Sequence, residues 1–314
     1  MTLAPRWWPR PGLLQDVPTV SRIFEVASGI RILTKCHWQS AGHSSSTILL
    51  VHGLEGCTES HYMRGIAHKA WHAGLNVVRM NQRNCGGSEH LSPTLYNGGM
   101  SGDLLAVTTE LANHDQMSDI WVAGYSMGGN LALKLAGEVG DNLPALKGII
   151  AVCPNIHPAK CVEALQQPKN WIYYQYFLRS LKDRLQRKAR LFPDKWDLTE
   201  LKRVRTLREF DDIYTSKDDG YQDADDYYER SGSRHVLGNI RLPTLILTAR
   251  DDPFIPYHIF EESAIQNNPA IHFVAPRYGG HCGFLQSPQP DEDLFWAENR
   301  ILEFIHHHRV IIGV

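Results

Sequence analysis

The residues best suited to chemistry begin with a serine set between glycines, at Gly124-Tyr125-Ser126-Met127-Gly128. This stretch matches the pattern G-x-S-x-G. The apolar residues before it predict a buried strand and those after it an amphipathic helix, so the chain must turn sharply at the serine. Glycines on both sides permit such a turn and leave one hydroxyl exposed. A serine hydroxyl becomes a nucleophile when a base takes its proton and N–H donors hold the oxyanion that forms.

Two backbone amides are expected to supply those donors. Met127 follows the serine at the start of a helix, where N–H groups have no intrahelical partner. The second donor is expected in the loop after the apolar run "STILLVHG", where Gly53 allows a close backbone approach. We therefore assign the N–H groups of Leu54 and Met127 to the oxyanion hole.

An acid and a histidine follow the serine in the chain. Asp251 and Asp252 come directly after the predicted strand "LPTLILTAR", and either could orient a histidine. We prefer Asp252 because it precedes "PFIP", the turn that leads away from the strand end. His281 lies in "RYGGHCGF", just after the predicted strand "IHFVAP". The chain order Ser126, Asp252, His281 is the order found in α/β-hydrolases.

The elements that must position these side chains form an α/β pattern. Apolar strand-like runs alternate with helical segments from "RIFEVAS" to "IHFVAP". This pattern predicts a mostly parallel sheet of eight strands with helices on both faces. The alternation stops at residues 155–239, which are helical, aromatic and charged. We expect residues 1–154 and 240–314 to form the core, and residues 155–239 to form a helical lid over the carboxyl ends of the strands.

Apolar residues spaced by three and four predict one long amphipathic helix within residues 170–192 of the lid. They are Tyr174, Phe177, Leu178, Leu181, Leu185, Ala189 and Phe192. The other face carries Arg179, Lys182, Arg184, Arg187, Lys188 and Arg190. Two interpretations stay open: a solvated basic face, or a peripheral contact with anionic lipid surfaces in which Trp171, Tyr173 and Tyr176 line an acyl pocket.

Composition excludes several other classes of protein. The 314 residues are 43% hydrophobic and carry a formal net charge of −2, which gives no indication of nucleic-acid binding. Six scattered cysteines without a C-x-x-C pair predict free thiols, and the N-terminus lacks the apolar centre of a signal peptide. No metal-ligand pattern occurs, and the adjacent His306, His307 and His308 point in different directions on a helix. We expect a cytoplasmic protein without a metal or other cofactor.

Several motifs together resemble the α/β-hydrolase superfamily, most closely its YheT-like branch of candidate esterases. They are "HGLEG", "NQRNCGGS", "GYSMGGN", "TLREFDDIYT", "ARDDPFIP" and "GGHCGF". The resemblance implies that Ser126, Asp252 and His281 form the catalytic triad, with Leu54 and Met127 as oxyanion donors. One departure is Asn84, where relatives usually carry glycine after the arginine.

The resemblance implies hydrolysis of carboxylic esters through an acyl-enzyme, with a role in lipid metabolism. The expected substrate is a small-molecule acyl ester with a short- to medium-chain or lipid-like acyl group. An acyltransferase would use the same residues and pass the acyl group to an alcohol. A non-catalytic binding protein of this fold would usually lack a member of the triad, and here all three residues are present.

Overall fold

The computed structural model describes residue 10 and residues 12–312. Its strands are β1 (Val20–Ala27), β2 (Ile30–His37), β3 (Thr47–Val51), β4 (Asn76–Met80), β5 (Ile120–Tyr125), β6 (Leu146–Val152), β7 (Thr244–Leu247) and β8 (Ile271–Val274). Its α-helices are α2 (His61–His72), α3 (Ser101–Asn113), α4 (Met127–Val139), α5 (Pro158–Leu165), α6 (Trp171–Leu191), α7 (Leu207–Phe210), α8 (Ser216–Asp218), α9 (Ala224–Ser231), α10 (Ser263–Gln266) and α11 (Trp296–Ile312).

The strands form one eight-stranded sheet in the order β1-β2-β4-β3-β5-β6-β7-β8. β1 and β2 form an antiparallel hairpin, β2 pairs antiparallel with β4, and the remaining neighbours are parallel. The predicted mostly parallel sheet is therefore confirmed. Its register aligns the carboxyl ends of β3, β5, β6, β7 and β8, so the loops that follow these strands meet at one edge.

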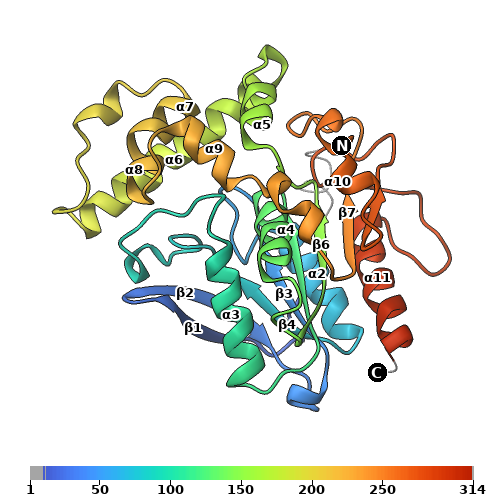
Figure 1. Cartoon of the computed structure of the whole chain (residues 1–314). Helices are drawn as coiled ribbons and strands as arrows, with labels where there is room; N and C mark the ends of the chain where they lie inside the picture. Colours follow the sequence, from blue (N-terminus) through green and yellow to red (C-terminus); the bar gives the residue numbers. More distant parts are fainter. Residues whose placement is uncertain (1–9, 11, 313–314) are drawn as a thin grey trace.

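Helices cover both faces of the sheet, as the continuous apolarity of its strands predicts (Figure 1). α2 and α11 pack together, α2 against β3 and β4 and α11 against β6 and β7. α3 and α4 pack together, α4 against β5 and β6. Every residue of β3, β4 and β5 is buried. The core of the molecule therefore lies along the central strands, directly beneath the edge where the loops meet.

The segment between β6 and β7 contains the helices α5 to α9 and no strand among the described residues. We call residues 155–239 the insertion. Figure 1 shows its helices gathered on one side of the molecule, beyond one end of the sheet. A π-helical turn (η5, Asp211–Thr215) continues α7. The insertion shares one continuous apolar cluster with the sheet through residues such as Leu178, Leu185 and Phe210.

The long helix of the insertion is α6, and its apolar face packs as predicted. Tyr174, Leu178 and Leu185 are buried against the core. The expectation of a solvated basic face is partly wrong, because Arg184 is 5% exposed and Lys188 is fully buried. These two cations bind groups on the core instead, whereas Arg179 and Arg187 stay exposed. The basic face is therefore in part the face by which α6 attaches to the core.

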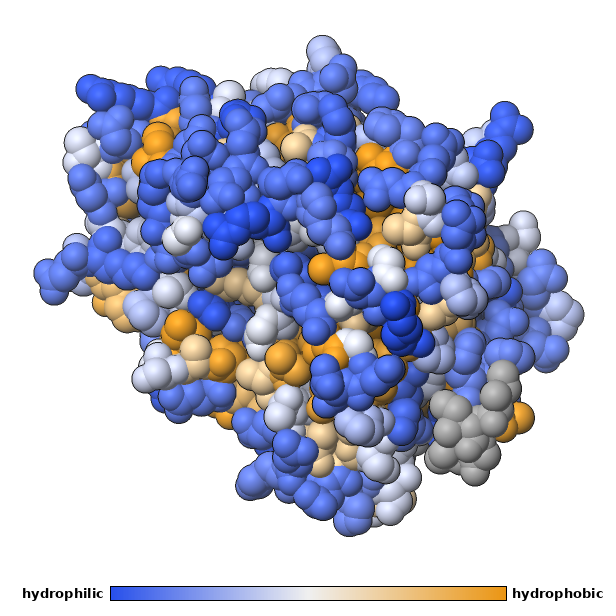
Figure 2. All heavy atoms as spheres, viewed as in Figure 1, coloured by the Kyte–Doolittle hydropathy of each residue, from blue (hydrophilic) through white to orange (hydrophobic). Residues whose placement is uncertain are grey.

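The insertion presents a mostly hydrophilic surface on the face seen in Figure 2, where smaller apolar areas lie between hydrophilic side chains. Within residues 12–312, no helix has the length and apolarity needed to cross a membrane.

Candidate active site

Ser126 sits at a sharp turn between β5 and α4. Its backbone has φ 53° and ψ −117°, a conformation that L-residues rarely adopt. Two glycines make the turn possible. A Cβ at Gly124 would collide with the carbonyl group of Gly128, and a Cβ at Gly128 would lie 2.5 Å from the carbonyl oxygen of Val51. The amide of Ser126 donates to the carbonyl oxygen of Val152 at 2.8 Å, which fixes the turn on the neighbouring strand.

The two adjacent aspartates after β7 have different partners. Asp252 Oδ2 lies 2.8 Å from His281 Nδ1, and its side chain is fully buried. Asp252 Oδ1 accepts the amides of Phe254 and Ile255 at 2.8 and 3.0 Å. Asp251 Oδ1 instead accepts the amides of Gly279 and Gly280, at 2.8 and 2.7 Å, and so fixes the loop that carries the histidine. The structure thus pairs His281 with Asp252, the aspartate that the sequence favours.

The imidazole of His281 is held in a buried, negatively charged setting. Burial lowers its pKa, but the charge of Asp252 and their hydrogen bond, with a contribution from Cys153, raise the pKa from 6.5 to about 10. The ring of Phe254 packs edge-on against it, with the ring centroids 4.8 Å apart. The next residue, Cys282, donates its amide to Cys153 Sγ at 3.3 Å and so attaches the loop to the end of β6.

Ser126 and His281 line the same two cavities. Cavity 1 has a volume of about 120 Å³ and extends under the insertion. Cavity 2 has a volume of about 320 Å³ and is bordered by the first turns of α6. Leu54, Phe177 and Phe254 also line both cavities, which therefore adjoin at the serine and the histidine.

The loop after β3 brings Leu54 to the serine. A Cβ at Gly53 would lie 3.0 Å from Ser126 Cβ, so this backbone approaches the serine closely. The amides on both sides of Leu54 are already bound. Gly53 donates to Tyr62 Oη at 3.1 Å, and Glu55 donates to Tyr96 Oη at 2.9 Å. Met127 is the first residue of α4, where amides have no acceptor within the helix. Both predicted donors therefore border the cavity that contains the Ser126 side chain.

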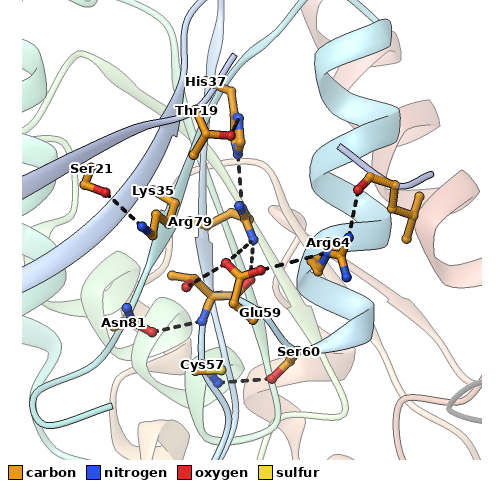
Figure 3. Close-up of polar contacts among 12 residues, drawn as sticks. Thr19, Ser21, Lys35, His37, Cys57, Glu59, Ser60, Arg64, Arg79 and Asn81 are labelled. Carbon is orange, nitrogen blue, oxygen red and sulfur yellow. Dashed lines mark hydrogen bonds and ion pairs between the residues drawn. The ribbon is translucent and has the colours of Figure 1, made fainter. Parts of the chain in front are cut away.

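A buried arginine of β4 binds the same loop through several polar contacts (Figure 3). Arg79 donates to the carbonyl oxygen of Thr58, to Glu59 at 3.1 Å and to His37 Nε2 at 3.1 Å. The amide of Thr58 donates in turn to Asn81 Oδ1 at 2.9 Å. The segment between β3 and α2 is thus fixed at both of its ends, by the sheet and by this arginine. Nothing in the sequence near Leu54 indicates this support, because Arg79 lies on another strand.

Another support comes from the insertion. Arg184 of α6 binds Glu55 through two bonds of 3.0 Å, and both side chains are almost completely buried. Tyr96 donates its hydroxyl to the same carboxylate at 2.7 Å. Glu55 itself has a positive φ of 56°, directly after Leu54. Arg184 also donates to the carbonyl oxygen of Asn84, whose φ of 67° is a backbone conformation that favours glycine.

The three aromatic residues predicted to line an acyl pocket lie in different places. Tyr173 and Tyr176 line cavity 2. Trp171 is 61% exposed and lines neither cavity, so its prediction is wrong. As the first residue of α6, it lies on the outer side of the helix, and the adjacent Ile172 borders the cavity instead. Sequence reasoning assigned Phe177 only to packing and gave Phe254 no role in the site.

Two groups of side chains in the described part of the chain have the spacing for a metal ion. The ligand atoms of Cys153, His281 and Cys282 lie within 4.8 Å of one another. However, burial raises the pKa of the Cys153 thiol well above its ordinary value, which keeps it neutral and a poor ligand. The second group joins His68 and His72 of α2 to Asp16, and none of the three lines either cavity. The expected absence of a metal stays a prediction.

Comparison of the sequence with known proteins gives consistent results. The family model described as "alpha/beta hydrolase fold" matches residues 46–288. The chain is 31% identical over 260 residues to the candidate esterase YheT of Escherichia coli, covering 82% of this chain and 76% of that protein. It is 31% identical over 245 residues to phospholipase ABHD3 of mouse, covering 78% of this chain. The chain spans only 59% of the length of the mouse protein.

Solved structures agree at the level of fold. The Pyrococcus furiosus esterase Pf2001 superimposes with a TM-score of 0.61 and 16% identity, covering 96% of each chain. Est1E of Butyrivibrio proteoclasticus gives a TM-score of 0.59 and 16% identity, covering 92% of this chain and 99% of the other. The family model and the match to YheT show that this chain belongs to the α/β-hydrolase superfamily, in the branch that contains YheT.

Proposed function

We propose that this protein is a serine hydrolase that cleaves carboxylic esters. The observation that carries the proposal is the arrangement around one pair of cavities. A strained serine and a histidine hydrogen-bonded to a buried aspartate line the same space. The relatives named esterase and phospholipase support the same class of reaction. Ser126, His281 and Asp252 are the proposed triad.

In the acylation step, His281 takes the proton of the Ser126 hydroxyl as the oxygen attacks the ester carbonyl carbon. The carbonyl oxygen becomes an oxyanion, which the amides of Leu54 and Met127 stabilise. Asp252 holds the proton on Nδ1 and stabilises the imidazolium, because its Oδ2 lies 2.8 Å from that nitrogen. His281 then donates its new proton to the leaving alkoxide, and the carbon–oxygen bond breaks to give a free alcohol and an acyl-enzyme.

In the deacylation step, water takes the place of the alcohol. His281 accepts one proton from the water as its oxygen attacks the acyl carbon. The second tetrahedral intermediate collapses, Ser126 leaves with the proton from His281, and the carboxylic acid is released. The cycle consumes one ester and one water, and it returns the enzyme to its starting state.

The cavities support short- to medium-chain or lipid-like acyl esters as substrates. Cavity 2 is lined mainly by aromatic and apolar side chains, among them Tyr173, Tyr176 and Phe177. Such a lining binds an acyl chain by removing apolar surface from water. The names of two relatives, phospholipase and monoacylglycerol lipase, are those of enzymes that act on esters of this kind.

Hydrolysis of a series of p-nitrophenyl esters, from acetate to decanoate, tests the proposal. We expect Ser126→Ala to lower kcat by about 10³-fold or more, because removing the nucleophile removes the covalent route. Ser287→Ala, at an exposed loop position, is the matched control and should retain activity. Full activity in Ser126→Ala would contradict the proposal.

Product analysis with added glycerol separates hydrolysis from acyl transfer, because transfer would yield a new ester in place of the acid.

A further inference from the structure

A carboxylate of the insertion faces the cavity that contains the serine. Asp211 lies in the π-helical turn η5 and lines cavity 1. Its Oδ1 accepts the Thr215 hydroxyl at 2.6 Å, and its Oδ2 accepts the Tyr228 hydroxyl at 2.7 Å. Burial raises the pKa of this carboxyl from 3.8 to about 6, so the group is mainly ionised at neutral pH. π-Helical turns often occur at functional sites.

No lysine or arginine among the described residues pairs with the charge on Asp211. Among the described residues, Asp211 takes part in no ion pair, and the lining of cavity 1 includes neither lysine nor arginine. The rest of that lining is largely apolar, with Leu165, Leu181 and Leu207 among its members. A carboxylate facing apolar surroundings is costly unless a hydrogen-bond donor meets it. The two hydroxyls that it accepts leave further lone pairs for a donor from the cavity.

A second acceptor lines the same cavity. Asn155, which follows the end of β6, has a buried Oδ1 that no described residue meets with a hydrogen bond. Buried acceptors without a partner are uncommon in folded proteins, and each one calls for an explanation. Asp211 comes from η5 and Asn155 from the loop that follows β6, so the two oxygens reach the cavity from well-separated positions in the chain. Both are suited to a ligand that carries hydrogen-bond donors.

We propose that cavity 1 binds the alcohol portion of the ester, and that this portion carries hydroxyl groups that donate to Asp211 and Asn155. The inference rests on the proposed esterase function. Cavity 2 suits the acyl chain better, because no carboxylate lines it and its border includes the exposed Ile172 and Tyr176. An alcohol without hydroxyl groups would displace water from Asp211 and give no donor in return. The preferred substrates are therefore esters of a polyol.

Two butyrate esters test this subsite directly. 1-Butyrylglycerol and propyl butyrate share the acyl group and the three-carbon alcohol skeleton, and they differ by two hydroxyls. We expect kcat/KM to favour the glycerol ester roughly 10-fold or more, the selectivity that hydrogen bonds to a charged acceptor typically give. In Asp211→Asn this ratio should fall several-fold, because an amide accepts hydrogen bonds more weakly than a carboxylate does. Asn155→Leu should lower the ratio in the same direction.

Asp212→Asn is the matched control. Its Oδ1 accepts the Ala224 amide at 2.7 Å and it does not line cavity 1, so the ratio should stay as in the wild type. A merely structural role of Asp211 would change the rates of both esters together and leave their ratio unchanged. That outcome would overturn the inference, as would a wild-type ratio near one.

An acyl-side comparison checks the orientation of the substrate. If ethyl 6-hydroxyhexanoate is preferred over ethyl hexanoate and the glycerol ester shows no advantage, cavity 1 binds the acyl portion and the assignment is wrong. Hydrolysis of none of these esters would instead contradict the proposed function, so the two failures are distinguishable.

Discussion

At the scale of single residues, the two aspartates after β7 have separable tasks. Asp252 contacts the imidazole, whereas Asp251 fixes the glycines that precede it. We expect Asp252→Asn to lower kcat by about 10⁴-fold, because the amide cannot stabilise the imidazolium or hold the same tautomer. Asp251→Asn should retain most activity, since an amide oxygen can still accept the two loop amides. Ester hydrolysis measured on both variants checks this, and equal losses would contradict it.

The hydrogen-bonded pair of Asp252 and His281 predicts the pH dependence of the reaction. The pKa of His281 is raised from 6.5 to about 10, and the imidazole acts as a base only when it is neutral. In the wild type, kcat/KM should therefore rise with pH, and the midpoint of this rise should lie well above pH 6.5. In Asp252→Asn the residual activity should also rise with pH, but its midpoint should lie at a lower pH, because the negative charge that favours the imidazolium is gone. A pH profile with the same midpoint in both proteins would count against this account.

The raised pKa of His281 also affects stability. Its folded-state pKa lies above the ordinary value, so the ion pair with Asp252 contributes its full stability below pH 6.5. That contribution is lost as the pH rises through about 10.

Gly124 determines whether the serine turn can form. An alanine there would place its Cβ against the carbonyl group of Gly128, which is backbone and cannot rotate away. We expect Gly124→Ala to lower the free energy of unfolding by about 3 kcal/mol or more and to impair catalysis. Gly102→Ala is the control, since a Cβ meets nothing within 4 Å at this exposed position of α3. It should stabilise the protein by up to about 1 kcal/mol. Similar unfolding curves for the two variants would contradict the prediction.

The sequence predicts the residues of the site better than their surroundings. Ser126, Asp252 and His281 each follow an apolar strand, and parallel strands place their carboxyl ends at one edge. The choice between Asp251 and Asp252 needs the structure, because both follow the same strand and only the local turn decides which carboxylate faces the imidazole. The position of Trp171 also could not be predicted, because periodicity gives the buried face of a helix but not which of its first residues border a cavity.

At the scale of elements, α6 is attached to the core by charges as well as by apolar contacts. Arg184 binds Glu55, and Lys188 donates to the carbonyl oxygens of Glu89 and Ser92. Their partners lie 96 to 129 residues earlier in the chain, so the sequence predicts the basic stripe but not its burial. The Arg184–Glu55 pair links the insertion to the residue after Leu54, a proposed oxyanion donor.

Removing this link should affect stability and catalysis together. Arg184→Met leaves Glu55 buried without its cation, which costs about 3–5 kcal/mol of unfolding free energy. We also expect kcat to fall more than KM rises, because the Leu54 amide acts mainly in the transition state. Chemical unfolding and ester kinetics measure the two effects.

Arg187→Met is the matched control on the same helix. Arg187 pairs with Glu89 at 2.9 Å with nearly half of its side chain exposed, so its loss should change stability by less than about 1 kcal/mol. Replacing Glu55 by Gln in the Arg184→Met protein should restore part of the stability, because the unpaired charge is then gone. An Arg184→Met protein as stable and active as Arg187→Met would show that the link is unimportant.

At the scale of the whole molecule, the sheet and the insertion share one apolar core. Buried residues of α6, α7 and η5 belong to the same cluster as those of the central strands. The alternation of strands and helices predicts the sheet, because each strand must be covered on both faces. The division of the chain into a core and a lid at residues 155–239 stays a prediction, since contacts of this kind join the two parts.

We expect the protein to unfold in a single cooperative transition. A small apolar cluster of Ala224, Tyr227 and Tyr228 lies within the insertion, but most of its buried residues belong to the cluster of the sheet, and its buried cations Arg184 and Lys188 bind groups of the core. Calorimetry should give equal calorimetric and van't Hoff enthalpies. Two resolved transitions, with the insertion melting first, would show that it folds as a separate domain.

The central claim is that Ser126 is a nucleophile activated by His281. The most direct measurement is covalent labelling with a fluorophosphonate, followed by mass spectrometry of the digested protein. The account predicts one modified site, Ser126, on the wild type, no labelling of Ser126→Ala, and much slower labelling of His281→Ala. Labelling at another serine, or equal labelling rates in the wild type and His281→Ala, would contradict it.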